Sequence, residues 1–118
     1  MAYNEILTNR VRAALAHIPQ VEEKKMFGSL AFMVNGKMCI NVGQDRIMSR
    51  IDPELHDQAL QRSGTQPVVM GGREYKGYIY INEEAIKSED DFDYWIGLAL
   101  DYNKRAKAST KRKKLDQS

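Results

Sequence analysis

Residues 24–40 have the sequence KKMFGSLAFMVNGKMCI, and this segment decides the fold. Apolar residues occupy alternate positions on both sides of Asn35-Gly36, a dipeptide that favours a two-residue hairpin turn because both of its positions accept positive φ. The segment therefore predicts a β-hairpin with strands at 29–34 and 37–42. No catalytic constellation accompanies it.

A second segment, GGREYKGYIYI at residues 71–81, predicts another strand over 74–81. Its residues alternate in the two-residue period of a strand, so they divide into two faces. We expect the face with Tyr75, Gly77, Ile79 and Ile81 to lie toward the core, and the face with Lys76, Tyr78 and Tyr80 to lie away from it.

The other elements follow from periodicity and capping residues. Residues 4–17 place apolar side chains, including Ile6, at helical spacing, and Pro19 prevents the helix from continuing. Ser88 is a good N-cap for a last helix that contains Trp95. The full expectation is helices at 4–17, 53–61 and 88–103, strands at 21–27, 29–34, 37–42, 46–51 and 74–81, and an irregular or edge segment at 67–72. This order predicts an α+β domain in which an antiparallel β-sheet meander of about five strands packs against N-terminal, middle and C-terminal helices.

Several short motifs occur in a characteristic order along the chain. They are Met26-Phe27-Gly28, Leu30-Ala31-Phe32-Met33, Asn35-Gly36-Lys37-Met38-Cys39, Gly72-Arg73, Lys76-Gly77-Tyr78 and finally Trp95. In this combination the sequence resembles the N-terminal domain of the TfoX/Sxy family over about residues 20–105. The resemblance implies a compact α+β domain.

The same resemblance implies a function. The named family members are bacterial regulators of natural competence, described as transcriptional coactivators that act alongside the cyclic-AMP receptor protein. They carry a second, C-terminal helical domain of comparable size, which this sequence lacks. We therefore expect a stand-alone, non-enzymatic regulatory or adaptor domain that contacts a protein partner, such as the transcription machinery, through its sheet or through the helix that contains Trp95.

The composition indicates one cytoplasmic domain. A chain of 118 residues is long enough to bury a core without metal or disulfide staples, and its one cysteine cannot form an internal disulfide. Charged residues occur where a signal peptide would need an apolar stretch, and no apolar run approaches the length of a membrane span. We expect a cytoplasmic protein with no membrane contact.

The charges are divided unevenly along the chain. Residues 1–103 carry eleven basic and fifteen acidic side chains, a net charge of −4, and we expect them to form the domain. Residues 104–118 are expected to form a basic, disordered tail. Two interpretations of this tail stay open, a non-specific nucleic-acid anchor in an accessory protein and a merely solvated chain end. The cations concerned are Lys104, Arg105, Lys107, Lys111, Arg112, Lys113 and Lys114.

The strand at 74–81 contains the strongest candidate for a contact with a partner or an anion. Its candidate residues are Arg73, Lys76, Tyr78 and Tyr80, with Arg50, Lys24 and Lys25 as further cations of the same face. The alternative is structural, with Arg73 paired to an acid such as Glu22 or Glu23 on a neighbouring strand and Gly77 admitting a close helix. If this strand lies at a sheet edge, it offers a route to a homodimer.

Other reactive residues lack the partners that chemistry requires. His17 and His56 have no cysteine or acidic cluster at metal-ligand spacing, so we expect both to be solvated. Cys39 is expected to be an inert thiol on the second face of the sheet, and Gly71-Gly72 precedes a strand rather than a phosphate-binding helix. The sequence therefore predicts no catalytic residue, no cofactor and no metal site.

Overall fold

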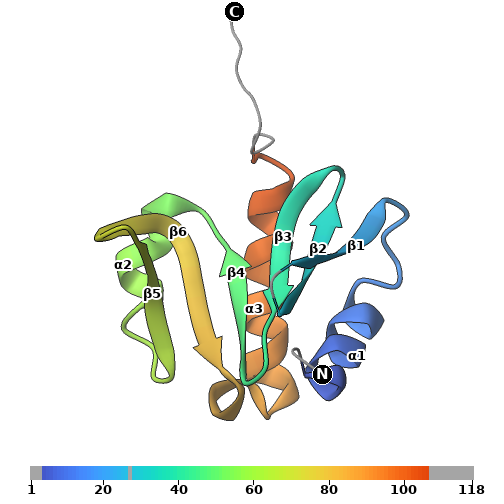
Figure 1. The fold of residues 1–118 in the computed structure, drawn as a ribbon, viewed down its shortest axis with the longest axis horizontal. Coiled ribbons are helices and arrows are strands. Elements are labelled where there is room, and N and C mark those ends of the chain that lie inside the picture. Colours follow the sequence, from blue (N-terminus) through green and yellow to red (C-terminus); the bar gives the residue numbers. More distant parts are fainter. Residues whose placement is uncertain (1–3, 27, 107–118) are drawn as a thin grey trace, which may run out of the picture.

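The computed structural model describes residues 4–26 and 28–106 of the chain. Its elements follow the expected order (Figure 1). The helices are α1 (Glu5–Ala14), α2 (His56–Ala59) and α3 (Glu89–Asn103), with two short 3-10 helices, η1 (Pro53–Leu55) and η2 (Glu83–Ile86). The strands are β1 (Val21–Met26), β2 (Ser29–Val34), β3 (Lys37–Val42), β4 (Arg46–Arg50), β5 (Thr65–Met70) and β6 (Arg73–Asn82).

All six strands form one antiparallel sheet in the order β1-β2-β3-β4-β6-β5. The α+β class and the meander from β1 to β4 are confirmed, but the count of about five strands was one too low. The segment at 67–72 was expected to be irregular or an edge, and most of it belongs to the edge strand β5. Pro67 is compatible with this position because a proline, which lacks an N–H donor, is tolerated in an edge strand.

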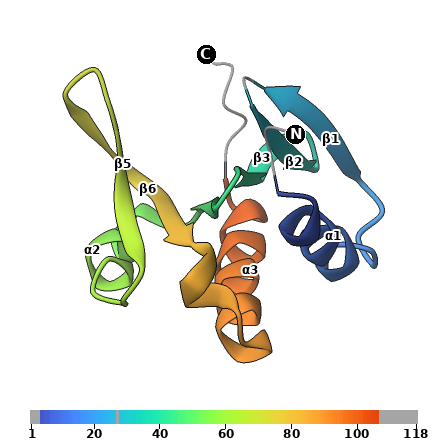
Figure 2. The same ribbon diagram turned by 60° about the horizontal axis from the view of Figure 1, so that its bottom comes forward.

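The helices all lie on one face of the sheet (Figure 2). The core fills the space between them, and its largest buried side chains include Leu7, Phe32, Ile40, Ile47, Ile81 and Trp95. Trp95 is only 2 % exposed, so the helix that contains it offers no tryptophan surface to a partner. Ile6 does not belong to the buried stripe of α1 and is 72 % exposed.

The other face of the sheet carries none of the described helices, and we call it the open face (Figure 2). It carries alternate residues of the strands, opposite in direction to the buried ones. On β4 the buried residues are Ile47 and Ser49, so Arg46 and Met48 lie on the open face. Arg50, at the end of the strand, also reaches Tyr102 of α3, at 5.7 Å.

Neither edge of the sheet is well suited to pairing with another strand. β1 carries four consecutive charged residues at 22–25, and β5 contains Pro67, and both features are typical of protected edges. β6 lies between β4 and β5, so the dimer expected from an exposed β6 edge is not available.

Cys39 lies in the core, which differs from the expected second face. Phe32 pairs with Ile40 and Met33 pairs with Met38, so Cys39 is an extra residue at a β-bulge. The bulge lets Cys39 and Ile40, although consecutive, both be buried. Burial raises the pKa of the Cys39 thiol to about 12, which favours an unreactive thiol.

The end of α3 is tied to the turn between β2 and β3. The Asn103 side-chain amide donates to the Val34 carbonyl at 3.1 Å, and Lys37 Nζ donates to the carbonyls of Asn103 and Ala106 at 2.7 and 3.0 Å. The packed structure therefore continues three residues past the expected domain end at 103. The other cations of the expected tail, Lys107, Lys111, Arg112, Lys113 and Lys114, lie outside the described residues.

Candidate functional site

The four residues of the expected anion contact do not form one cluster. Arg73 lies at the end of the β5–β6 hairpin, with its guanidinium 5.8 Å from the centre of the Tyr75 ring. Lys76 turns toward α2 and forms an ion pair with Asp57 at 3.3 Å. Only Tyr78 and Tyr80 remain together, on the open face.

The expected pairing of Arg73 with Glu22 or Glu23 is also wrong. Glu23 forms a bidentate ion pair with Arg12 of α1, at 2.7 and 2.8 Å. The hydrogen bonds from Arg12 lower the Glu23 pKa. β1 and β6 are separated by three strands, so their side chains cannot meet across one strand boundary.

Gly77 is the residue that redirects β6. Its φ of +89° is unfavourable for other residues, and a Cβ atom built on it would lie 2.8 Å from the Ile51 carbonyl oxygen and 3.2 Å from Pro53 Cγ. The close approach of a helix, expected at Gly77, is therefore confirmed for η1. Before Gly77, Glu74 and Lys76 point to α2; after it, Tyr78 points to the open face.

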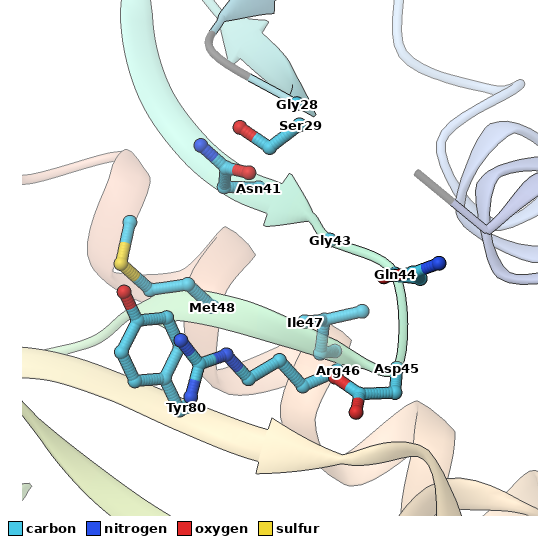
Figure 3. Close-up of a pocket in the computed structure, with 10 residues that line it drawn as sticks. All are labelled: Gly28, Ser29, Asn41, Gly43, Gln44, Asp45, Arg46, Ile47, Met48 and Tyr80. Atoms are coloured by element: carbon cyan, nitrogen blue, oxygen red, sulfur yellow. The ribbon is translucent and has the colours of Figure 1, made fainter. Parts of the chain in front are cut away.

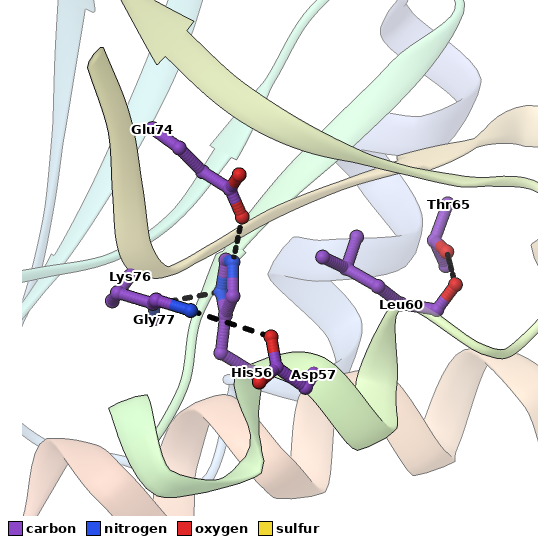
Figure 4. Close-up of polar contacts among 7 residues, drawn as sticks. All are labelled: His56, Asp57, Leu60, Thr65, Glu74, Lys76 and Gly77. Atoms are coloured by element: carbon purple, nitrogen blue, oxygen red, sulfur yellow. Dashed lines mark hydrogen bonds and ion pairs between the residues drawn. The ribbon is translucent and has the colours of Figure 1, made fainter.

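His56 was expected to be solvated, but it is only 1 % exposed (Figure 4). Its Nδ1 accepts the Gly77 N–H at 2.9 Å, and its Nε2 lies 2.6 Å from Glu74 Oε2. Because Nδ1 is an acceptor, the proton of the neutral ring is on Nε2 and is donated to Glu74. Both ring nitrogens hold β6 against α2, so His56 has a structural role. The feature of the sequence that could have indicated this burial is Gly77, because a glycine within a strand often marks a close approach of another segment.

On the open face, tyrosines of β6 meet arginines of β4. The strand register places Met48 opposite Tyr80 and Arg50 opposite Tyr78. The Arg46 guanidinium lies only 3.5 Å above the centre of the Tyr80 ring, and the Arg50 guanidinium lies 5.7 Å from the Tyr78 ring. These are cation–π contacts. The sequence interpretation included Arg50 but missed Arg46, which two-residue alternation along β4 would have identified.

A pocket of about 400 Å³ adjoins the Arg46–Tyr80 pair (Figure 3). Its floor is formed by neighbouring strands, and one wall is the turn from Gly43 to Arg46. The residues around it include Asn41, Gln44, Asp45, Arg46, Met48 and Tyr80. Figure 3 shows the Arg46 guanidinium lying along the Tyr80 ring, with Asn41 across the pocket from them.

Three backbone hydrogen bonds hold the turn from Gly43 to Arg46 in place. The Gly43 N–H donates to the Arg46 carbonyl at 2.8 Å, the Asn4 N–H donates to the Gly43 carbonyl at 2.9 Å, and the Glu83 N–H donates to the Asp45 carbonyl at 2.9 Å. The pocket wall is therefore part of the rigid fold.

Arginines of the helix-covered side have carboxylate partners. Arg12 pairs with Glu23, Arg62 with Asp91, and Arg105 with Asp52. The hydrogen bond from Arg105 lowers the pKa of Asp52. By contrast, Arg46 and Arg73 form no ion pair with any residue in the ranges 4–26 and 28–106, although each lies against a tyrosine ring, as Arg62 and Arg105 also do.

The hairpin end exposes three large apolar side chains. Val69 and Met70, opposite Glu74 and Arg73 in the register, are 54 % and 56 % exposed, and Tyr75, the residue after Glu74, is 38 % exposed. Figure 2 shows the β5–β6 hairpin projecting from the body of the domain. We call Val69, Met70 and Tyr75 the hairpin tip.

Other kinds of site are not evident in the part of the chain that the structure describes. There, no three histidine, cysteine or acidic residues gather as metal ligands would. No described helix is both long enough and apolar enough to pass through a bilayer.

The comparisons with known proteins agree with this architecture. The family model of the TfoX N-terminal domain matches residues 13–102, a span that includes the β2–β3 hairpin, Gly77 and Trp95. No curated protein and no solved structure matches the chain. The matched span covers well over half of the 118 residues. The chain therefore belongs to the TfoX N-terminal domain family.

Proposed function

We propose that this protein is a non-enzymatic regulatory or adaptor domain of the bacterial cytoplasm that binds a protein partner through the hairpin tip. The observation that carries the proposal is the exposure of Val69 and Met70, two consecutive residues of β5 whose apolar side chains are each more than half exposed. Membership of the TfoX N-terminal domain family is consistent with such a role.

The hairpin tip has the composition of a protein interface. Large apolar and aromatic side chains with a neighbouring arginine are enriched at the centres of interfaces, and here Arg73 lies against Tyr75. The hairpin is also held in place, because His56 binds Gly77 and Glu74 below the tip. A partner would therefore meet a preorganised surface.

The helix that contains Trp95 is a poorer candidate for this contact. Its apolar residues face the core, and Trp95, Phe92 and Ala99 are all buried. Its first turn is acidic, with Glu89, Asp90 and Asp91. We therefore assign the partner contact to the sheet rather than to this helix.

The test uses purified bacterial RNA polymerase and cyclic-AMP receptor protein, because the family resemblance points to the transcription machinery. We expect one of them to bind the immobilised full chain, and a Val69→Ser, Met70→Ser double variant to lose at least about tenfold in affinity. Ile6→Ser is the matched control, since Ile6 is an exposed apolar residue on α1. Equal binding by the double variant and the wild type, or no binding of either protein to the wild type, would contradict the proposal.

A second candidate function, non-specific DNA binding through residues 104–118, is supported by the charge of that segment. Seven cations between 104 and 114 would give an affinity that falls steeply with salt. The measurement is anisotropy of labelled duplex DNA with the full chain and with a chain that ends at Ala106, which keeps the carbonyl bound by Lys37. Binding that survives this truncation, or that does not respond to salt, would rule out the tail as the DNA-binding segment.

A further inference from the structure

We propose that the open face binds single-stranded nucleic acid, with one base stacked on the Arg46–Tyr80 pair at the pocket. This function is independent of the protein contact at the hairpin tip. It is also distinct from duplex binding by residues 104–118, because it depends on bases rather than on phosphate charge alone.

The first argument is the charge of the open face. Arg46 has no carboxylate partner among the described residues, whereas Arg12, Arg62 and Arg105 on the helix-covered side each have one. Arg46 therefore keeps its positive charge available to a phosphate. Arg50, four residues further along β4, lies 5.7 Å from both the Tyr78 ring and the Tyr102 ring of α3 and has a buried guanidinium nitrogen, so Arg46 rather than Arg50 supplies this charge.

The second argument is the planar surface. Bases in single strands stack on aromatic rings and on guanidinium planes. The Arg46 guanidinium lies 3.5 Å above the Tyr80 ring, so the pair presents a flat surface whichever member a base meets. Gln66 Oε1, 3.4 Å from Arg46 Nη1, supports this position from β5. Tyr78 lies two residues from Tyr80 on the same face, and strand spacing separates such residues by about 7 Å.

The third argument is the chemistry of the pocket. The amides of Asn41 and Gln44 and the hydroxyl of Ser29 are among the groups around it. Amides both donate and accept hydrogen bonds, as the edges of bases do. A pocket of about 400 Å³ beside a stacking surface therefore offers a base both a flat contact and polar edge contacts.

The carboxylate among the pocket residues is Asp45, and it limits where phosphates can lie. Since Asp45 would repel a phosphate, we expect the nucleic-acid backbone to leave the pocket in the direction of Tyr78. This geometry also favours a nucleic acid over an acidic peptide. A peptide carboxylate would use the Arg46 charge and the amide donors but would not stack on the rings.

The test is fluorescence anisotropy of a labelled oligouridylate of about twelve nucleotides with the full chain, with an abasic strand of equal length as a second probe. We expect the wild type to bind oligouridylate more tightly than the abasic strand. Tyr80→Leu should weaken oligouridylate binding roughly 10- to 100-fold and leave abasic binding unchanged. Tyr80→Phe, which keeps the ring, should retain binding, and Asp45→Asn should strengthen it.

Two controls separate base stacking on the open face from charge attraction by the chain end. Replacing Lys113 and Lys114 by Gln should weaken binding of both probes equally, because those residues act through charge alone. Amide NMR signals of the wild type should shift at Asn41, Arg46 and Tyr80 on adding oligouridylate, a result that does not require any variant to fold.

The proposal is overturned by any of three results. These are equal affinity for the two probes, oligouridylate binding that is unchanged in a folded Tyr80→Leu variant, and NMR shifts confined to residues away from the open face. Competition by a polyglutamate peptide that itself depends on Tyr80 would also overturn it and would assign the open face to an acidic polypeptide.

Discussion

The arginines on the two sides of the sheet differ in their carboxylate partners, although Arg62 and Arg105 also lie over tyrosine rings. On the helix-covered side, carboxylates bind Arg12, Arg62 and Arg105. On the open face, Arg46 lies against the Tyr80 ring and has no carboxylate partner among the described residues. The first arrangement joins elements of the domain to one another, since Arg12 links α1 to β1. The second leaves positive charge and flat surfaces at the exterior. This difference supports the proposal that the open face binds a ligand, while the paired arginines of the other side stabilise the domain.

The largest effect that would test this division is expected at Gly77. Gly77→Ala should lower the free energy of unfolding by about 3 kcal/mol, because alanine is strained at a φ of +89° and its Cβ would lie 2.8 Å from the Ile51 oxygen. Urea unfolding measures this. Gly71→Ala is the matched control: its φ is +61° and nothing lies within 4 Å of a Cβ there, so only the strain should appear. Equal effects of the two substitutions would show that close packing at Gly77 is unimportant.

His56→Gln should have the next largest effect on stability. The substitution removes the Nδ1 acceptor of the Gly77 N–H and the Nε2 donor to Glu74, both beneath the hairpin. We expect a loss of about 2 kcal/mol in the free energy of unfolding. His17→Gln, at an exposed position, should change it by less than about 0.5 kcal/mol. Equal free energies of unfolding for the two variants would contradict the structural role of His56.

Cys39 gives the helix-covered side a dependence on alkaline pH. Burial raises the thiol pKa to about 12 from its ordinary value of 9.0, so the unfolded chain releases this proton at lower pH than the folded protein. The contribution of Cys39 is therefore full below pH 9.0 and is lost as pH rises toward 12, by at most about 1.4 kcal/mol per pH unit. The measurement is the free energy of unfolding of the wild type and of Cys39→Ala between about pH 8 and 11. If the two free energies change with pH in parallel, the raised pKa of the Cys39 thiol is contradicted.

The smallest effect comes from the arginines themselves. Arg12→Gln should cost less than about 1 kcal/mol at neutral pH. Because Arg12 lowers the Glu23 pKa, this contribution is present above the unfolded pKa of Glu23 and is lost as pH falls through the folded value. Arg46 has no carboxylate partner among the described residues. The effect of Arg46→Gln on the free energy of unfolding should therefore not change as pH falls. A similar acid dependence for both variants would remove the distinction between the two sides.

Local patterns in the sequence predicted most of the fold. The Asn35-Gly36 turn and the alternating residues around it defined β2 and β3, and Ser88 defined the start of α3, where its Oγ accepts the Asp91 N–H. These features depend on neighbouring residues and on general preferences of turns and caps. Such information is present in a single sequence.

The differences arose where the outcome depends on distant residues. The burial of His56 requires the bend at Gly77, and the position of Cys39 requires a bulge opposite β2. The predicted pairing of Arg73 with an acid on β1 was wrong because local periodicity identifies the strands but not their order in the sheet. For the candidate site, alternation identified the tyrosines, but only the register between β4 and β6 placed Arg46 on Tyr80.

The hydrogen bonds between the end of α3 and the β2–β3 hairpin affect how the chain folds during synthesis on the ribosome. Lys37 cannot bind the carbonyls of Asn103 and Ala106, and Val34 cannot accept the Asn103 amide, until those residues have been synthesised. Since α3 covers β3 and β4, the apolar face of these two strands stays uncovered until α3 has left the exit tunnel. The nascent chain therefore completes its fold only after almost the whole domain has been translated.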